Sequence, residues 1–246
     1  MQLDATELAA FYETPIGLAA RRAILRRVKL IWPEVRDRRV LGLGFTVPYL
    51  RPWLAEAERI ISFMPAQQGV LVWPPERNLC TLGDETALPF PDAFFDRILV
   101  VHGLEGAESV RPLLRQLWRS LAPEGRILIV APNRASLWAQ LVYSPFALGR
   151  PYHRIELSEL LKAAMFEPQR WDRALCAPPV QSRRLLGTGK TWESVGRRVW
   201  PALAGVHLVE ASKSLVAPLR QRARARGERV LAPARVGSMK VLPDHF

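Results

Sequence analysis

Short, continuously apolar runs recur along this 246-residue chain, and segments with helical spacing lie between them. Runs of this kind are typical of parallel strands that are buried on both faces. They comprise residues 39–44, 59–63, 96–101 and 126–130, and a further strand-like run covers residues 206–215. The alternation of strands and helices predicts an α/β fold with a mostly parallel central sheet flanked by helices.

The clearest helical pattern lies between the third and fourth of these runs. Its apolar side chains repeat at intervals of three and four residues. They are Val110, Leu113, Leu114, Leu117, Trp118 and Leu121. The segment 123–125, Pro-Glu-Gly, ends this helix, and we expect further helices at residues 49–58 and 157–164.

The N-terminal part predicts two helices that precede the first strand. Asp4 and Glu7 have the spacing of a capping box, and residues 15–17, Pro-Ile-Gly, interrupt the helical pattern before it resumes. We therefore divide the chain into an N-terminal helical cap (1–37), an α/β domain (38–217) and a basic C-terminal tail (218–246) whose low apolar content does not guarantee order.

The formal net charge of +12 is concentrated at the two ends of the chain. The basic residues are Arg21, Arg22, Arg26, Arg27 and Lys29 in the second helix and Arg220, Arg222, Arg224, Arg226 and Arg229 in the tail. Two interpretations stay open: solvated helix faces, or contact with an anionic partner such as nucleic acid or a membrane surface.

Other sequence features indicate a soluble, cytoplasmic protein. No run approaches the roughly 20 apolar residues that cross a bilayer. The first residues carry Asp4 where a secretory signal would carry a base. Cys80 and Cys176 have neither a disulfide pattern nor a metal-ligand spacing, so we expect two reduced thiols and no metal site.

Candidate chemistry gathers where the predicted strands end, because parallel sheets bind ligands at the carboxyl ends of their strands. After the first strand, residues 42–46 read Gly-Leu-Gly-Phe-Thr. Glycine lacks the Cβ that would block close approach of a ligand, so this turn either wraps a nucleoside-like ligand or is required only for packing.

A longer match precedes the third strand. From Gly83 to Asp96 an acidic pair is followed by Leu-Pro-Phe and then by Phe-Asp. This run resembles the signature of class I S-adenosylmethionine-dependent methyltransferases of the type 11 kind, which have a Rossmann-like fold. The helix and strand from Leu113 to Asn133 and the late helix from Leu157 to Phe166 are similar to the family in the same order, so the resemblance spans about residues 38–215.

The resemblance implies S-adenosylmethionine as cofactor, with Asp84 accepting a hydrogen bond from the adenine amine. The cofactor-binding residues that it implies are Gly42, Leu43, Gly44, Phe45, Met64, Asp84, Glu85 and Val101. Two departures concern the family's cofactor site. The acid that precedes the first glycine is missing, and Phe63 and Met64 stand where the family has a carboxylate for the ribose hydroxyls, with Gln67 and Gln68 nearby.

For catalysis, a sulfonium methyl donor needs mainly an aligned nucleophile and a dry pocket. His102, with Glu105 three residues later, is the candidate general base; the alternative is a histidine that only bonds to backbone. Tyr12 and the segment 143–153 have the aromatic and polar character of a lid over the acceptor, or are packed connectors.

The function that follows is methyl transfer to an unidentified acceptor, with a small molecule as our first interpretation. One alternative is a catalytically inactive methyltransferase-like binding or assembly factor, which the missing ribose carboxylate favours. Another is an RNA-modifying methyltransferase, which the basic ends favour, although Val100, Val101, His102 and Gly103 stand where an Asn-Pro-Pro-Tyr motif would lie. A nicotinamide dehydrogenase is disfavoured, because the Gly-x-Gly-x-x-Gly spacing is missing.

Overall fold

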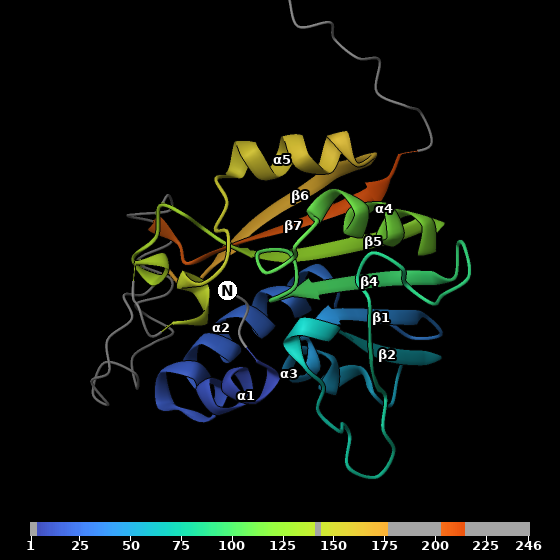
Figure 1. Cartoon of the computed structure of the whole chain (residues 1–246), viewed down its shortest axis with the longest axis horizontal. Coiled ribbons are helices and arrows are strands. Elements are labelled where there is room, and N and C mark those ends of the chain that lie inside the picture. The colour runs from blue at the N-terminus through green and yellow to red at the C-terminus, as the bar shows by residue number, and fades with distance from the viewer. Residues whose placement is uncertain (1–3, 141–143, 177–202, 215–246) are drawn as a thin grey trace, which may run out of the picture.

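The structure is a computed structural model that describes residues 4–140, 144–176 and 203–214. Within them, one sheet of seven strands has the order β3-β2-β1-β4-β5-β7-β6 (Figure 1). The strands are β1 Arg39–Gly44, β2 Arg59–Pro65, β3 Cys80–Gly83, β4 Phe95–Val101, β5 Leu121–Pro132, β6 Phe166–Ala174 and β7 Val206–Lys213. The strands from β3 to β5 pair in parallel, whereas β7 runs antiparallel to both of its neighbours. The expected mostly parallel α/β sheet is confirmed.

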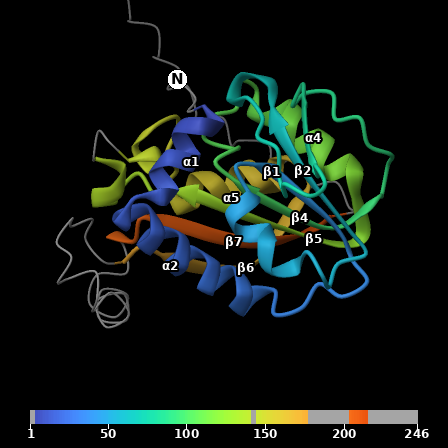
Figure 2. The same ribbon diagram turned by 90° about the horizontal axis from the view of Figure 1, so that it is seen from below.

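Helices cover both faces of this sheet. The longer helices are α1 Ala5–Glu13, α2 Pro15–Ile31, α4 Val110–Ser120 and α5 Arg154–Ala163. The short ones are α3 Val47–Leu50, η1 Arg51–Trp53, η2 Ala66–Gln68, η3 Leu137–Ala139 and η4 Pro145–Ala147. In Figures 1 and 2, α1, α2 and α3 lie on one side of the sheet, and α4 and α5 lie on the other.

Alternate residues of each central strand point into one of two apolar cores. On β4, Leu99 and Val101 belong to the core beneath α1 and α2, whereas Ile98 and Val100 belong to the core beneath α4 and α5. Burial on both faces explains why these strands are continuously apolar in sequence.

The two N-terminal helices are present as expected. Asp4 caps α1, and Thr14 ends α1 and caps α2, whose first residue is Pro15. The stripe of α2 that contains Ile24 and Val28 is buried, and α2 packs against β6 and β7. The second helix is therefore a layer of the α/β fold. The boundary that we placed at residue 37 stays a prediction, and the tail from residue 218 lies outside the described residues.

Three local expectations differ from the structure. Residues 49–58 do not form one helix; α3 gives way to the short η1, which contains Pro52. Strands β3 and β6 were not expected, and both are edge strands of the sheet.

Candidate functional site at the carboxyl edge of the sheet

The turn after β1 is packed against the segment that follows β4. Gly44 has a φ of 80°, in the left-handed region that favours glycine. A Cβ on Gly44 would collide with the carbonyl oxygen of Val101 and would lie 2.9 Å from the backbone nitrogen of Gly103. Glycine is therefore required here by the backbone angle and by the close approach of β4.

The structure brings the predicted cofactor residues to the carboxyl ends of four neighbouring strands. They are Gly42, Leu43, Gly44 and Phe45 on β1 and its turn, Met64 on β2, Asp84 and Glu85 after β3, and Val101 on β4. The strand register aligns Gly44 with Val101, and Met64 with Leu82. Of the predicted residues, only Asp84 is exposed, and the others are covered by protein atoms. Their role in binding stays a prediction.

Asp84 is an exposed carboxylate in a tight turn. One of its oxygens, Oδ1, accepts hydrogen bonds from the backbone nitrogen and from Oγ1 of Thr86, both at 2.7 Å. These bonds, the backbone one first, hold the pKa of Asp84 below its usual range. The carboxylate is thus ionised at neutral pH and fixed in direction by its turn.

Glu85 is buried, unlike its neighbour. Its Oε1 accepts a hydrogen bond of 3.0 Å from the backbone nitrogen of Glu108, ahead of α4. Burial raises the pKa of this carboxyl. In the structure, Glu85 joins the turn after β3 to the start of α4.

The end of β2 carries no acid. Phe63 and Met64 are fully buried, and the ring of Phe63 lies against Gly83. Of the two glutamines that follow, Gln67 is exposed, whereas Gln68 is buried and donates from Nε2 to the carbonyl oxygen of His102 over 2.8 Å. This edge of the sheet is therefore apolar where the family has a ribose-binding carboxylate.

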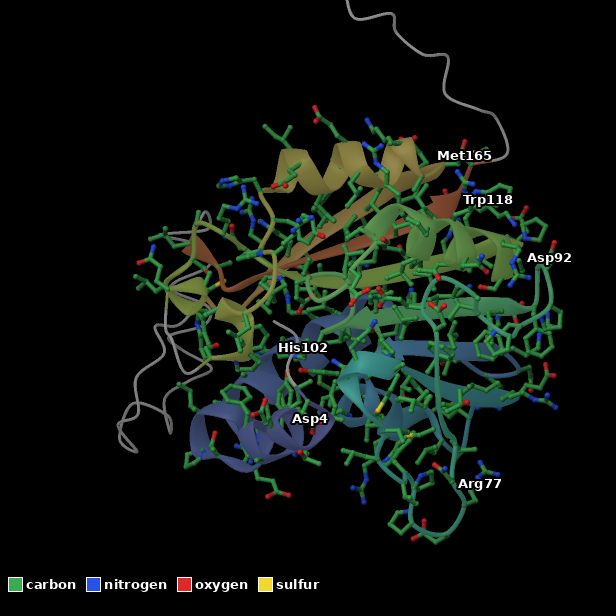
Figure 3. All side chains as sticks on the ribbon, viewed as in Figure 1. Asp4, Arg77, Asp92, His102, Trp118 and Met165 are labelled. Atoms are coloured by element: carbon green, nitrogen blue, oxygen red, sulfur yellow. The ribbon has the colours of Figure 1, made fainter. Side chains whose placement is uncertain are left out.

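His102 lies at the carboxyl end of β4 on the side of α1 (Figure 3). It is buried, and its φ of 51° is uncommon for a residue with a side chain. Its Nδ1 lies 3.1 Å from Oε1 of Glu105, and its Nε2 lies 2.7 Å from the hydroxyl of Tyr12. Both ring nitrogens are thus bonded to side chains; Glu105 was noted from its sequence spacing, whereas the contact with Tyr12 was not expected.

A second phenol extends this chain of hydrogen bonds. The hydroxyl of Tyr49 donates to the hydroxyl of Tyr12 over 2.8 Å. Burial raises the pKa of both tyrosines well above its usual value, so both are neutral phenols. Because Nδ1 of His102 faces the Glu105 carboxylate, Nδ1 carries the proton and Tyr12 donates to Nε2. Sequence reasoning missed Tyr49, which looked like an ordinary residue of an expected helix.

Aromatic rings enclose the polar chain. Phe45 is stacked on Tyr12 with ring centres 5.8 Å apart, and Phe146 of η4 lies 5.1 Å from His102. The hydroxyl of Tyr152 donates to the carbonyl oxygen of Leu104 over 3.3 Å. The structure thus brings Tyr12 and the described part of the 143–153 segment to the same place, as a lid would require; Tyr143 lies outside the described residues.

No group of three or more His, Cys, Asp or Glu side chains in the described part of the chain is arranged to hold a metal ion. None of the helices described is both long and apolar enough to cross a membrane.

Comparison with known proteins agrees with this geometry. A family model described as "Methyltransferase domain" matches residues 47–129. The malonyl-[acyl-carrier protein] O-methyltransferase of Halorhodospira halophila is 34% identical over 103 residues, which are 39% of this chain and 35% of that protein. The ubiquinone/menaquinone biosynthesis C-methyltransferase UbiE of Pectobacterium carotovorum is 46% identical over 44 residues, 18% of each chain. The chain thus matches about a third or less of the length of these curated relatives.

The fold extends the similarity beyond the matched segments. A protein of Thermotoga maritima, described as a methyltransferase and possible histamine N-methyltransferase, superimposes with a TM-score of 0.61. The superposition covers 85% of this chain and 95% of the other, at 17% sequence identity. With the family-model match and the strand order, these findings show a Rossmann-like α/β fold of the methyltransferase type. Over residues 47–129 the chain is similar to the methyltransferase domain family, and its fold is that of S-adenosylmethionine-dependent methyltransferases.

Proposed function

We propose that this protein binds S-adenosylmethionine at the carboxyl edge of its sheet and transfers the methyl group to a small-molecule acceptor. The observation that carries the proposal is the Gly44 turn, which meets the end of β4 so closely that a Cβ has no room. Parallel α/β sheets bind ligands at this edge, so the close approach of the two strand ends supports the proposal.

The residues around this edge offer polar groups for the adenine end of the cofactor and for its amino acid end. Asp84 offers an ionised carboxylate for an adenine amine, and a charged acceptor makes the stronger kind of hydrogen bond. Glu105 and Gln68 each keep a buried oxygen with no partner among the described residues. The middle of the site fits less well, because Phe63 and Met64 give the ribose no acceptor.

When bound, S-adenosylmethionine supplies a methyl group on a sulfonium, which is electrophilic without further activation. The chain then has to exclude water, orient the acceptor and remove its proton. Phe45, Tyr12 and Phe146 form an apolar enclosure around His102. Since Tyr12 occupies Nε2 of His102, a proton from the acceptor reaches this histidine either through the Tyr12 hydroxyl or after Tyr12 moves away.

A non-catalytic role is the second candidate. The buried Phe63 and Met64 at the end of β2 favour it, because they remove the polar contact that would hold the ribose. In this role the fold would serve as a binding or assembly factor. The basic residues of α2 and of the tail support a further proposal, an anionic partner such as nucleic acid or a membrane surface, and with it the RNA-modifying alternative.

Calorimetric titration of the full chain with S-adenosylhomocysteine distinguishes the first two functions. Binding supports the methyltransferase, and the same titration with S-adenosylmethionine should give a dissociation constant of similar order. Absence of binding at millimolar ligand would remove the enzyme proposal and leave the scaffold.

A further inference from the structure

Two buried oxygens near His102 have no hydrogen-bond donor among the described residues: Oε2 of Glu105 and Oε1 of Gln68. Glu105 is 6% exposed and Gln68 is 1% exposed. Buried acceptors without donors are rare in folded proteins and are costly, most of all when they are charged. The pair therefore indicates a missing donor at this place.

Both side chains are fixed by hydrogen bonds that leave one oxygen of each without a donor. Glu105 uses Oε1 to bond Nδ1 of His102, and Gln68 uses Nε2 to donate to the carbonyl oxygen of the same histidine. The backbone of Glu105 is held as well, because the backbone nitrogen of Arg150 donates to its carbonyl oxygen over 2.8 Å. Two acceptor oxygens are thus positioned around one residue before any ligand binds.

The surroundings favour a positively charged donor. In the part of the chain that the structure describes, no Lys or Arg side chain forms an ion pair with Glu105. The rings of Tyr12 and Phe146 pack on His102, and the faces of aromatic rings attract cations. A buried carboxylate, an amide oxygen and aromatic walls together suit an ammonium group.

We propose that Glu105 and Gln68 bind the α-ammonium group of the methionine moiety of the cofactor. This inference rests on the proposed function. The sheet order β3-β2-β1-β4 puts the ends of β3 and β4 about 14 Å apart, three spacings of about 4.8 Å, and Asp84 and Glu105 follow these two ends. A nucleoside that carries an amino acid is long enough to place its adenine at Asp84 and its amino group at Glu105.

The amino acid part of the cofactor also carries a negatively charged α-carboxylate. The charges of Glu105 and of Arg21 on α2 act in opposite directions on the pKa of Tyr12: Glu105 raises it and Arg21 lowers it. A zwitterionic amino acid carries the complementary pair of charges. Both oxygens are buried, so ligand entry requires a part of the protein around them to move.

Calorimetry with two ligands tests the assignment. S-adenosylhomocysteine carries the ammonium group, and 5′-methylthioadenosine lacks the whole amino acid part. Glu105→Gln keeps the shape of the side chain and its acceptor for His102 but removes the charge. We expect this variant to bind S-adenosylhomocysteine roughly 10- to 150-fold more weakly, the range of a hydrogen bond to a charged group, and to bind 5′-methylthioadenosine as the wild type does.

Glu108→Gln is the matched control, since Glu108 is an exposed carboxylate three residues along the chain. It should bind both ligands like the wild type. Equal affinity of Glu105→Gln and wild type for S-adenosylhomocysteine overturns the inference, and so does an equal loss for both ligands, which would indicate general damage to the site. If the wild type binds neither ligand, it is the proposed function itself that fails.

Discussion

The guanidinium of Arg27 lies 2.8 Å from the carboxylate of Asp172, although 145 residues separate the two in sequence. Both side chains are mostly buried, with 16% and 15% of their surface exposed. The pair fastens α2 to β6. Among the basic residues of α2, for which the sequence left open a solvated face or an anionic partner, Arg27 instead makes a contact within the fold.

Arg27→Ala should lower the free energy of unfolding by about 1 to 3 kcal/mol, because it leaves the mostly buried Asp172 carboxylate without its charged partner and with the backbone nitrogen of Arg173 as its remaining donor. Arg26→Ala is the matched control, since Arg26 is exposed on the same helix, and its effect should stay within about 0.5 kcal/mol. Urea denaturation of the two variants measures the difference. Similar values for both would mean that the ion pair adds nothing to stability.

Removal of residues 219–246 should weaken binding to nucleic acid or to anionic vesicles and reduce its salt dependence. Each lost phosphate contact removes about one unit of slope in a double-logarithmic plot of affinity against salt. Fluorescence anisotropy or vesicle co-sedimentation at several salt concentrations measures this slope. Identical binding by the shortened and the full chain would make the tail a solvated appendage.

Asp84→Ala should weaken binding of S-adenosylhomocysteine by roughly 10- to 150-fold, since a hydrogen bond to a charged group contributes about 1.5 to 3 kcal/mol. We expect Asp84 to make a large part of the polar contribution to binding, because Phe63 and Met64 give the ribose no polar contact. Thr86→Val is the control: it removes one hydrogen bond to Asp84 and keeps the carboxylate. Wild-type affinity in Asp84→Ala would show that the adenine binds elsewhere.

Hydrogen exchange should become slower in α1 and in residues 144–153 when S-adenosylhomocysteine is added. Tyr12 and Phe146 both pack on His102, so a ligand enclosed there stabilises the two segments together. Mass spectrometry of peptides from the full chain follows the change, with α4 as an internal reference. Unchanged exchange in both segments at saturating ligand would make them packed connectors.

His207 makes stability dependent on pH. Burial, followed by the charge of Arg173, lowers its pKa to about 4, against about 6.5 in an unfolded chain. Between these values the unfolded state binds more protons, so the free energy of unfolding falls as the pH falls, by about 2 kcal/mol from pH 7 to pH 5. Urea denaturation at both values should show this loss in the wild type and a smaller one in His207→Leu. Equal losses in the two proteins would assign the pH dependence to other groups.

The central strands of the sheet were predictable from sequence, whereas its two edge strands were not. A strand buried on both faces is a continuous apolar run, which the segment 96–101 displays. Edge strands lose that signal because one side is open to solvent. Strand β6 contains Pro168, Gln169 and Arg170, and β3 has only four residues, so neither stands out from a loop.

The strand ends that form the site were predictable, but the contacts within the site were not. Glycines, acids and a histidine at strand ends are local features of the sequence, and parallel pairing brings them to one edge. The bond from Tyr12 to His102 joins residues 90 positions apart and depends on how α1 crosses the sheet. The lack of a donor for Oε2 of Glu105 and for Oε1 of Gln68 likewise could not be predicted, because it depends on all the residues that surround them in the fold.

The position of β7 has a consequence for the order in which this protein is completed during synthesis. Strand β7 is the last strand described, yet it lies between β5 and β6, both of which leave the ribosome earlier. Until Val206–Lys213 has emerged, the backbone of β5 has an open edge and β6 has no strand to pair with. Before this segment has emerged, the nascent chain has an unpaired strand edge and is prone to aggregate; after it has emerged, β7 can pair with both neighbours and complete the sheet.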